Sequence, residues 1–374
     1  MTLNIIAEVP EWIRSLAPYP PGKPIEELER EYGIFGSIKL ASNENPLGPS
    51  PKAVAAVSAA LGNLHRYPDG DCFYLKGAVA KKLGVSPDAL LFGNGSNELI
   101  ELAVRTFMQR GDDAVMADQA FAIYRIVVQA AGGTSRIVPL RNYTHDLDAI
   151  LEAITPATRL VFLANPNNPT GTVFFRREWE DFLSAVPAHV IVVMDEAYFE
   201  FVEDPAYPDS LAAHGKARAL ITLRTFSKIY GLAGLRIGFG VAHPALIEMM
   251  NRVRQPFNVS SLAQIAALAA LGDHEHVTRT KQCNREGMAY VRQQCTRLGL
   301  EYVPSWANFL LIRVGNGKRV YEALLREGVI VRPMAFYGLP DHIRVTIGLP
   351  AENERFVAAL EKVLRAGGAG AAPF

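Results

Sequence analysis

The stretch Thr225-Phe226-Ser227-Lys228 is followed shortly by Gly231-Leu232-Ala233-Gly234-Leu235-Arg236. An apolar run at 220–223 precedes it, so we expect the lysine at the carboxyl end of a strand, the edge where open α/β sheets bind ligands. A lysine between hydroxyls and glycines is placed to form a Schiff base with an aldehyde cofactor, whose phosphate the hydroxyls and Arg236 could bind. The same pattern also fits an exposed lysine in a glycine-rich turn.

Short apolar runs alternate with helical patterns along the chain before this stretch. The runs lie at 89–92, 114–117, 159–164 and 190–194. Such alternation predicts an α/β fold with a mainly parallel sheet covered by helices. The run from Arg236 to Ala242 follows Lys228 too closely for a helical crossover, so we expect that strand to be antiparallel.

These patterns divide the chain into three predicted parts. Its length of 374 residues exceeds what one hydrophobic core usually serves. Residues 1–37 contain the proline-rich segment 17–24, which cannot form a regular helix or inner strand and is read as an arm. Residues 38–275 form the large, sheet-containing domain. Residues 276–374 begin with a long polar helix and form a smaller α+β domain, which the arm is expected to help complete.

Composition argues against several classes of protein. Lysine plus arginine and aspartate plus glutamate both total 38, so no net field favours nucleic acid or an anionic membrane. The three cysteines, Cys72, Cys283 and Cys295, lack the spacing of a disulfide framework or a zinc site. No apolar run is long enough to span a bilayer, and the first residues lack signal-peptide features. We therefore expect a cytoplasmic enzyme without a metal, a nucleic-acid partner or a membrane partner.

A carboxylate ends another apolar strand, in Val193-Met194-Asp195-Glu196-Ala197-Tyr198. Burying a carboxylate is costly unless a cation accompanies it. A protonated pyridine nitrogen would supply that cation and would keep the ring an electron sink. The alternative interpretation of Asp195 is a helix N-cap.

Two turns follow other predicted strands. The turn Asn165-Pro166-Asn167-Asn168-Pro169-Thr170-Gly171 is rigid enough to aim the Asn168 amide at a ring oxygen, which Tyr198 could also approach, although an ordinary loop is possible. The segment Gly93-Asn94-Gly95-Ser96-Asn97-Glu98 precedes a helix, whose free amides attract phosphate. It could also begin a dinucleotide fold with Asp118 as the ribose acid, but Glu98 replaces the third glycine.

In this order and spacing the four signals resemble the fold-type I pyridoxal-phosphate aminotransferases, over nearly the whole chain. Further stretches are similar to the histidinol-phosphate aminotransferase family, namely Pro18-Tyr19 with Pro21-Gly22-Lys23-Pro24, Leu40 to Gly48, Arg66-Tyr67-Pro68-Asp69, and Val331-Arg332-Pro333 through Tyr337-Gly338-Leu339-Pro340 to Ile343-Arg344. The resemblance implies pyridoxal 5'-phosphate as cofactor, a homodimer, and an N-terminal arm that takes part in the dimer contact.

The resemblance also implies a role for each matching residue. The catalytic set would be Lys228 as Schiff-base lysine and general base, Asp195 at the pyridine nitrogen, and Tyr198. Further cofactor contacts would come from Asn168 at the ring oxygen, Phe121 stacked on the ring, and Ser96, Asn97, Thr225, Ser227, Arg236 and a second subunit's Tyr67 at the phosphate. The substrate would be bound by Asn43, Arg332, Arg344 and Tyr19, with Tyr19 also expected from the second subunit.

The reaction implied by the resemblance converts L-histidinol phosphate and 2-oxoglutarate to 3-(imidazol-4-yl)-2-oxopropyl phosphate and L-glutamate, in histidine biosynthesis. Two alternatives use similar machinery. An aminotransferase for aromatic amino acids would place Arg344 on a carboxylate and leave Arg332 idle. A pyridoxal-phosphate decarboxylase for an amino-acid phosphate would need no oxo acid.

Overall fold

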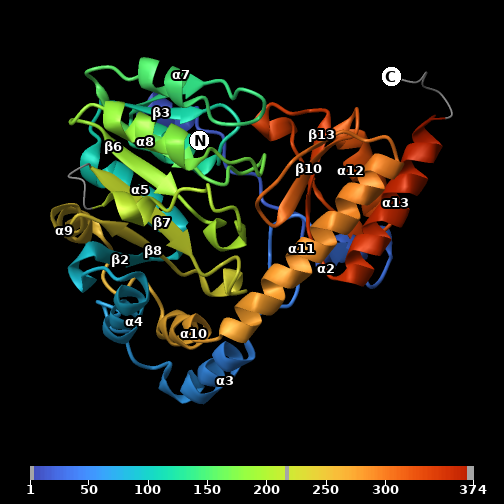
Figure 1. The fold of residues 1–374 in the computed structure, drawn as a ribbon, viewed down its shortest axis with the longest axis horizontal. Helices are drawn as coiled ribbons and strands as arrows, with labels where there is room; N and C mark the ends of the chain where they lie inside the picture. Colours follow the sequence, from blue (N-terminus) through green and yellow to red (C-terminus); the bar gives the residue numbers. More distant parts are fainter. Residues whose placement is uncertain (1–3, 215–218, 369–374) are drawn as a thin grey trace.

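The structure, a computed structural model, describes residues 4–214 and 219–368. Two lobes lie side by side, and the long helix α11 (His274–Arg297) runs from the lower edge of the large lobe into the small lobe (Figure 1). The large lobe contains a seven-stranded sheet and the small lobe a four-stranded one. The polar pattern that predicted a long helix from about residue 276 is confirmed.

The large sheet has the order β2-β8-β7-β6-β5-β3-β4. Its strands are β2 (Leu90–Gly93), β3 (Asp113–Ala117), β4 (Thr134–Val138), β5 (Thr158–Ala164), β6 (Ile191–Asp195), β7 (Leu220–Thr225) and β8 (Gly238–Ala242). Strand β8 runs antiparallel to both its neighbours, and the other pairings are parallel. The predicted mainly parallel sheet and its antiparallel strand are thus confirmed. Strand β4 was not predicted, because it lies at the sheet edge and most of its residues are exposed or half-buried.

Helices cover both faces of this sheet because alternate strand residues point to opposite sides. Leu160 and Phe162 face one cluster, whereas Val161 and Leu163 face another. The first face is covered by α5 (Gly95–Phe107), α6 (Ile123–Ala130) and α9 (Pro244–Val253), and the second by α7 (Leu147–Glu152), α8 (Arg176–Ala185), α4 (Phe73–Leu83) and α10 (Ser261–Leu271), with α3 (Pro51–Ala60) against α10. The result is a three-layered lobe whose parallel strands all end at one edge.

The small lobe is built around an antiparallel sheet of order β12-β13-β10-β9. Its elements are β9 (Tyr302–Val303), β10 (Phe309–Arg313), α12 (Gly317–Arg326), β11 (Val329–Ile330), β12 (Arg332–Pro333), β13 (His342–Thr346) and α13 (Pro350–Gly368). Strand β11 pairs in parallel with β1 (Ile38–Lys39), and Leu28 of α2 (Ile25–Tyr32) is buried against Ile330. The chain before residue 40 therefore contributes to the small lobe. The division at residues 37 and 275 stays a prediction, and residues 1–3 and 369–374 of its outer parts lie outside the described residues.

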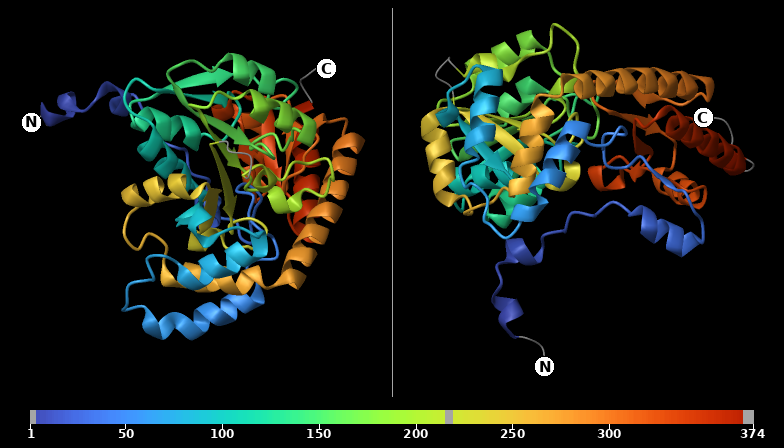
Figure 2. Two further views of the ribbon diagram at one scale, coloured as in Figure 1. Left: turned by 60° about the vertical axis from the view of Figure 1, so that its left-hand side comes forward. Right: turned by 90° about the horizontal axis from the view of Figure 1, so that it is seen from below.

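The N-terminal segment reaches away from the body of the chain (Figure 2). The short helix α1 (Glu11–Arg14) rests on α6, where the Gln129 side chain donates a hydrogen bond to the Trp12 carbonyl at 2.9 Å. Before it, the 3-10 turn η1 (Asn4–Glu8) exposes Ile5 and Ile6. A single chain thus leaves apolar side chains of its arm uncovered.

The loop after Lys228 is packed against the segment that passes between the lobes. Gly231 has a φ of +70°, and a Cβ atom there would lie 2.1 Å from the Gly48 carbonyl oxygen. Only glycine meets both demands without strain. The close approach fixes the turn that carries Lys228 against residues 42–48.

We expect Gly231→Ala to lower the thermal midpoint of unfolding by several degrees. A left-handed backbone costs a residue with a side chain about 1–3 kcal/mol, and the contact with Gly48 adds to that cost. Gly234→Ala is the matched control in the same loop, since a Cβ atom there meets nothing within 4 Å. Differential scanning calorimetry of both variants measures the difference, and equal midpoints would contradict the packing argument.

Candidate active site

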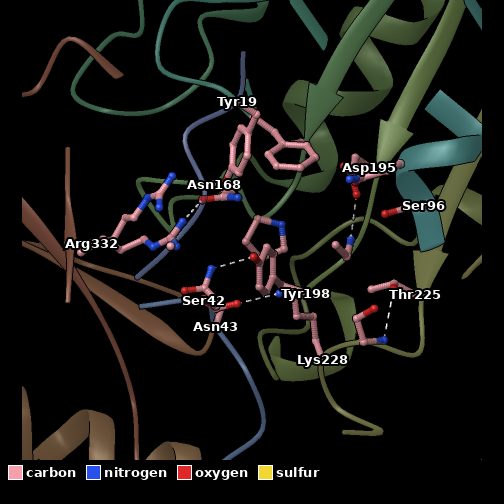
Figure 3. Close-up of a pocket in the computed structure, with 18 of the residues that line it drawn as sticks. Tyr19, Ser42, Asn43, Ser96, Asn168, Asp195, Tyr198, Thr225, Lys228 and Arg332 are labelled. Carbon is pink, nitrogen blue, oxygen red and sulfur yellow. Dashed lines mark hydrogen bonds between the residues drawn. The ribbon is translucent and has the colours of Figure 1, made fainter. Parts of the chain in front are cut away.

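A cavity of about 240 Å³ lies between the carboxyl ends of β5, β6 and β7 and the small lobe (Figure 3). Every residue predicted to bind cofactor or substrate lines it except Tyr67. The predicted residues gathered there are Tyr19, Asn43, Ser96, Asn97, Phe121, Asn168, Asp195, Tyr198, Thr225, Ser227, Lys228, Arg236, Arg332 and Arg344. The structure therefore brings together residues from the arm, the large lobe and the small lobe.

Lys228 lies in the turn between β7 and β8, partly buried rather than exposed. Its Nζ atom donates a hydrogen bond to the Ser42 carbonyl at 3.1 Å and lies 5.7 Å from the centroid of the Tyr198 ring. Burial lowers the pKa of Lys228 to about 8, and the charges of Arg344 and Arg236 act in the same direction. The amine is therefore far more often neutral at physiological pH than a surface lysine is.

Asp195 is the last residue of β6 and is buried. The Tyr124 hydroxyl donates to its Oδ2 atom at 2.8 Å, and the Ala197 amide donates to Oδ1 at 3.1 Å. Burial raises the pKa of Asp195, an effect that the Tyr124 hydrogen bond partly offsets. The described residues include no ion-pair partner for this carboxylate. It does not cap a helix either, because the next one, η4 (Phe199–Phe201), has Tyr198 at its N-cap.

Tyr198 and Asn168 offer hydrogen-bond donors on a neighbouring wall. The Asn43 side-chain amide donates to the Tyr198 hydroxyl oxygen at 2.8 Å, which leaves the Tyr198 proton free to donate. Burial raises the pKa of Tyr198 to about 12, so the phenol stays protonated. The Oδ1 atom of Asn168 accepts from the Arg344 guanidinium, so the amide nitrogen of Asn168 is the group left to donate.

One end of the cavity is built to receive an anion. Helix α5 begins at Gly95, and its N-cap residue Asn94 makes no side-chain capping bond. The amides of Ser96 and Asn97 lie in the first turn, where no intrahelical partner exists and the helix dipole is positive. Arg236 lies beside them, since a Cβ atom on Gly95 would be 2.7 Å from its Nη2 atom.

Hydroxyl groups complete this anion-binding end of the cavity, and the arrangement does not match a dinucleotide site. Thr225 and Ser227 line the cavity, with the Ser227 hydroxyl 3.5 Å from Nη1 of Arg236. Asp118 does not line it, and its carboxylate accepts from the backbone amides of Gln119 and Leu140 instead. The alternative role of Asp118 as a ribose acid is therefore not supported.

Two arginines form the other end, and Figure 3 shows one of them, Arg332, on the side opposite Ser96 and Thr225. Arg332 and Arg344 are direct cross-strand partners on β12 and β13. Arg332 donates to the Pro20 carbonyl at 2.6 Å, and Arg344 donates to the Ala41 carbonyl at 2.8 Å. Neither has an ion pair among the described residues, and the buried Nε atom of Arg344 has no partner. Like charges placed opposite each other repel, so the pair is suited to an anion between or beside them.

Tyr19 and Tyr67 were both expected to come from a second subunit, but they lie in different places relative to the cavity of their own chain. The Arg332 guanidinium carbon is 5.4 Å from the ring centroid of Tyr19 in the same chain. The expectation that a partner supplies Tyr19 is therefore wrong: the proline-rich arm passes beside the small lobe and places Tyr19 in its own pocket. Tyr67 is 83% exposed, stacks on Phe257 at 4.9 Å and lies outside the pocket.

Sequence reasoning missed two groups at this site. Tyr124 lines the cavity and bonds to Asp195, but it lies inside an apolar helical pattern that indicates only core packing. Ser42 contributes a backbone carbonyl, which no side-chain pattern can indicate. Phe121, predicted to stack on a ring, does line the cavity and meets Tyr124 edge-on at 5.7 Å.

Other kinds of site are not evident in residues 4–214 and 219–368. Within these ranges no group of three or more His, Cys, Asp or Glu side chains is placed to hold a metal ion. None of the helices described is both long and apolar enough to cross a membrane. The cysteines at 72, 283 and 295 are free.

Comparisons with known proteins agree with this geometry. The model of the aminotransferase class I and II family matches residues 36–360. Histidinol-phosphate aminotransferase 1 of Nitrosococcus oceani is 53% identical over 353 residues, which cover 94% of this chain and 95% of that protein. The histidinol-phosphate aminotransferase of Moorella thermoacetica is 51% identical over 364 residues, covering 96% and 94%.

Solved structures give the same answer. The crystal structure of histidinol-phosphate aminotransferase from Sinorhizobium meliloti in complex with pyridoxal-5'-phosphate superposes with a TM-score of 0.88 at 30% identity. The match covers 96% of this chain and 98% of that one. The chain therefore belongs to the class I and II aminotransferases and, among them, to the histidinol-phosphate aminotransferase family.

Proposed function

We propose that this chain uses pyridoxal 5'-phosphate to transfer the amino group of L-histidinol phosphate to 2-oxoglutarate, in histidine biosynthesis. The products are 3-(imidazol-4-yl)-2-oxopropyl phosphate and L-glutamate. The names of the relatives and the cofactor in the Sinorhizobium meliloti structure support this proposal. The observation that carries it is one pocket with two positively charged ends and, between them, a lysine whose pKa is lowered to about 8.

The residues of the pocket fit the cofactor. Asp195 is a buried carboxylate without an ion-pair partner in the part of the chain that the structure describes, and a protonated ring nitrogen would supply one. Asn168 and Tyr198 would donate to the ring oxygen, and Phe121 would stack on the ring. The phosphate would be bound by the amides of Ser96 and Asn97, the side chains of Thr225, Ser227 and Arg236, and Tyr67 of a second subunit.

Lys228 performs the proton transfer in this proposal. The bound cofactor supplies an electron-withdrawing ring that accepts the electrons released when the donor's α C–H bond breaks. Lys228 would hold the cofactor through its amine until the donor amine took its place. The amine so freed, with its pKa lowered by burial, would be the base that takes the proton from the donor's α-carbon and the acid that gives it back. Asp195 keeps the ring nitrogen protonated throughout.

The arginine pair determines which donor fits. Histidinol phosphate carries a phosphate where an amino acid carries its carboxylate, whereas 2-oxoglutarate carries carboxylates. Arg344 is fixed by Ala41 and Asn168, so it presents a planar guanidinium to either anion. Arg332 adds a second positive charge that suits a doubly charged phosphate, and Tyr19 lies beside it. Asn43 also lines the cavity and donates to the Tyr198 hydroxyl.

The proposed active unit is a cytoplasmic homodimer. Tyr67 lies outside its own pocket, in a region that also exposes apolar side chains of α3, of α4 and of the segment between them. These exposed residues are Val54, Leu61, Leu64, Phe73 and Tyr74. Burial of this region and of Ile5 and Ile6 against a second copy would remove apolar surface from water and bring Tyr67 to the partner's phosphate site.

The first prediction from the proposed function concerns the pH dependence of cofactor attachment. Only the neutral amine attacks an aldehyde, and a lowered pKa makes Lys228 neutral at lower pH. The rate at which cofactor-free protein gains visible absorbance with pyridoxal phosphate should therefore rise with a midpoint near pH 8. Stopped-flow absorbance between pH 6 and 10 measures it, with Lys228→Ala as the blank. A rate that still rises steeply at pH 10 would show that the pKa of Lys228 is not lowered and would contradict the prediction.

The second prediction concerns substrate class. Arg332→Ala should weaken use of histidinol phosphate by roughly 2–5 kcal/mol in kcat/KM, the range for removing one member of a buried charge pair. An unphosphorylated aromatic donor should lose less. Arg313→Ala, an exposed arginine on β10 paired with Glu301, is the control and should change neither donor.

Glutamate formation is the assay for both donors. Equal losses for the two donors would mean that Arg332 does not recognise the donor's phosphate. That outcome would favour the alternative function, an aminotransferase for aromatic amino acids. Release of carbon dioxide from an amino-acid phosphate, without consumption of 2-oxoglutarate, would instead identify the decarboxylase.

The third prediction tests the shared site. Homodimers of Lys228→Ala and of Tyr67→Ala should each be nearly inactive. In a mixed dimer one site carries both lesions and the other carries neither, so random exchange should restore roughly a quarter of wild-type activity by two-fold symmetry. If mass spectrometry verifies exchange and no activity returns, Tyr67 does not serve the partner's site.

A further inference from the structure

Tyr124 is a buried titratable group that the mechanism above does not use. It lies in α6 and is completely buried, yet it borders the cavity. Its hydroxyl donates to Oδ2 of Asp195 at 2.8 Å. A tyrosine that served only core packing would not need to place its hydroxyl on Asp195, the acidic residue that lines the cavity.

The Tyr124 ring is held from two sides by other aromatic rings. Phe162 of β5 stacks parallel to it at 4.8 Å with an interplanar angle of 10°. Phe121 meets it edge-on at 5.7 Å and 89°, and Phe121 itself lines the cavity. The hydroxyl of Tyr124 therefore has little freedom to leave Asp195. The Tyr124 side chain thus supports two residues that line the cavity, Asp195 and Phe121.

Asp195 depends on few groups for its charge. Its other oxygen accepts from the Ala197 amide, and the remaining titratable groups that face it are Lys228 and Tyr198. Of the groups that favour its charged form, Tyr124 has the largest effect. A neutral Asp195 could not hold a proton on a ring nitrogen, because it would no longer offer a negative charge.

We propose that Tyr124 is a positioning residue, which keeps Asp195 ionised and fixed in orientation so that Asp195 can hold a proton on the ring nitrogen of the bound cofactor. The inference rests on the proposed function and deepens it. Tyr124 touches neither substrate nor cofactor in this role. It acts through Asp195 and, by packing, through Phe121.

The test compares Tyr124→Phe with Tyr230→Phe. Both changes delete a buried phenol hydroxyl and keep the ring. The Tyr230 hydroxyl accepts from Lys82 at 3.3 Å, away from the cavity. Thermal unfolding, cofactor dissociation and the pH dependence of the cofactor's visible absorbance are measured on the dimeric holoenzyme without any donor, followed by the rate of the donor half-reaction.

Tyr124→Phe should bind the cofactor about ten- to a hundredfold more weakly than Tyr230→Phe does, the range expected for one hydrogen bond to a charged group. The pH at which the cofactor's visible absorbance changes should be higher in Tyr124→Phe. The reason is that a ring nitrogen without its proton no longer carries the positive charge that opposes protonation of the link to Lys228. The half-reaction should slow by a similar factor in kcat with little change in KM, because the ring nitrogen acts in the transition state.

A second pair separates the hydrogen bond from packing. Tyr124→His retains a ring N–H donor and should keep its absorbance transition closer to the wild type than Tyr124→Leu does. This pair also carries the test if Tyr124→Phe does not fold. Equal behaviour of Tyr124→Phe and Tyr230→Phe, or equal shifts in the His and Leu variants, would overturn the positioning role.

The two proposals fail in different ways. A wild-type protein that binds the cofactor but rejects histidinol phosphate would refute the proposed substrate, while the donor-free comparison of absorbance would still decide the role of Tyr124. A wild-type protein that takes up no cofactor would overturn both.

Discussion

The burial of Asp195 without an ion-pair partner among the described residues is the constraint on which the site depends. At the end of β6 its side chain is buried, and within the described ranges only the Tyr124 hydroxyl and the Ala197 amide donate hydrogen bonds to the carboxylate. A buried charge with so little support is unfavourable unless a ligand completes it. The buried carboxylate lies at the edge of the large lobe where the parallel strands end. Helix α5 presents its positive end at the same edge.

The same edge must be joined to the small lobe, and buried polar side chains make the connection. Asn43, between the lobes, donates its backbone amide to Thr346 and its side chain to Tyr198, while its carbonyl accepts from Asn308. Its φ of +56° shows that the backbone is bent to reach all three. Arg344 adds bonds to Ala41 and Asn168. A shift of one lobe would therefore change the positions of the ring-oxygen donors and of the anion site together.

The sequence predicted six of the seven strands of the large sheet, the antiparallel return after Lys228 and, through the family resemblance, most of the polar residues that meet in the cavity. Strong apolar runs specify central strands such as β5, whereas the exposed edge strand β4 carried no such pattern. Tyr124 was missed because helical periodicity cannot distinguish a core tyrosine from one that serves a carboxylate. The origin of Tyr19 was mistaken because an irregular proline-rich arm has no periodicity from which its path could be read. Tyr67 lies outside the cavity of its own chain, so the packing of a single chain does not test its proposed role at a second subunit's phosphate site.

The distribution of charge explains how a chain with no net charge can bind anionic ligands. Lysines plus arginines equal aspartates plus glutamates over the whole chain, so attraction at long range is absent. Within the cavity, however, Arg236, Arg332, Arg344 and Lys228 face only Asp195 among the acids that line it. Burial lowers the pKa of Lys228 to about 8, the charges of Arg344 and Arg236 act in the same direction, and Arg332 lies opposite Arg344 across two paired strands. A bound phosphate at each end would offset the repulsion among these positive charges, so ligand binding and the stability of the folded chain should be coupled. The pocket is thus selective through local excess charge, with one end suited to the cofactor and the other to the substrate.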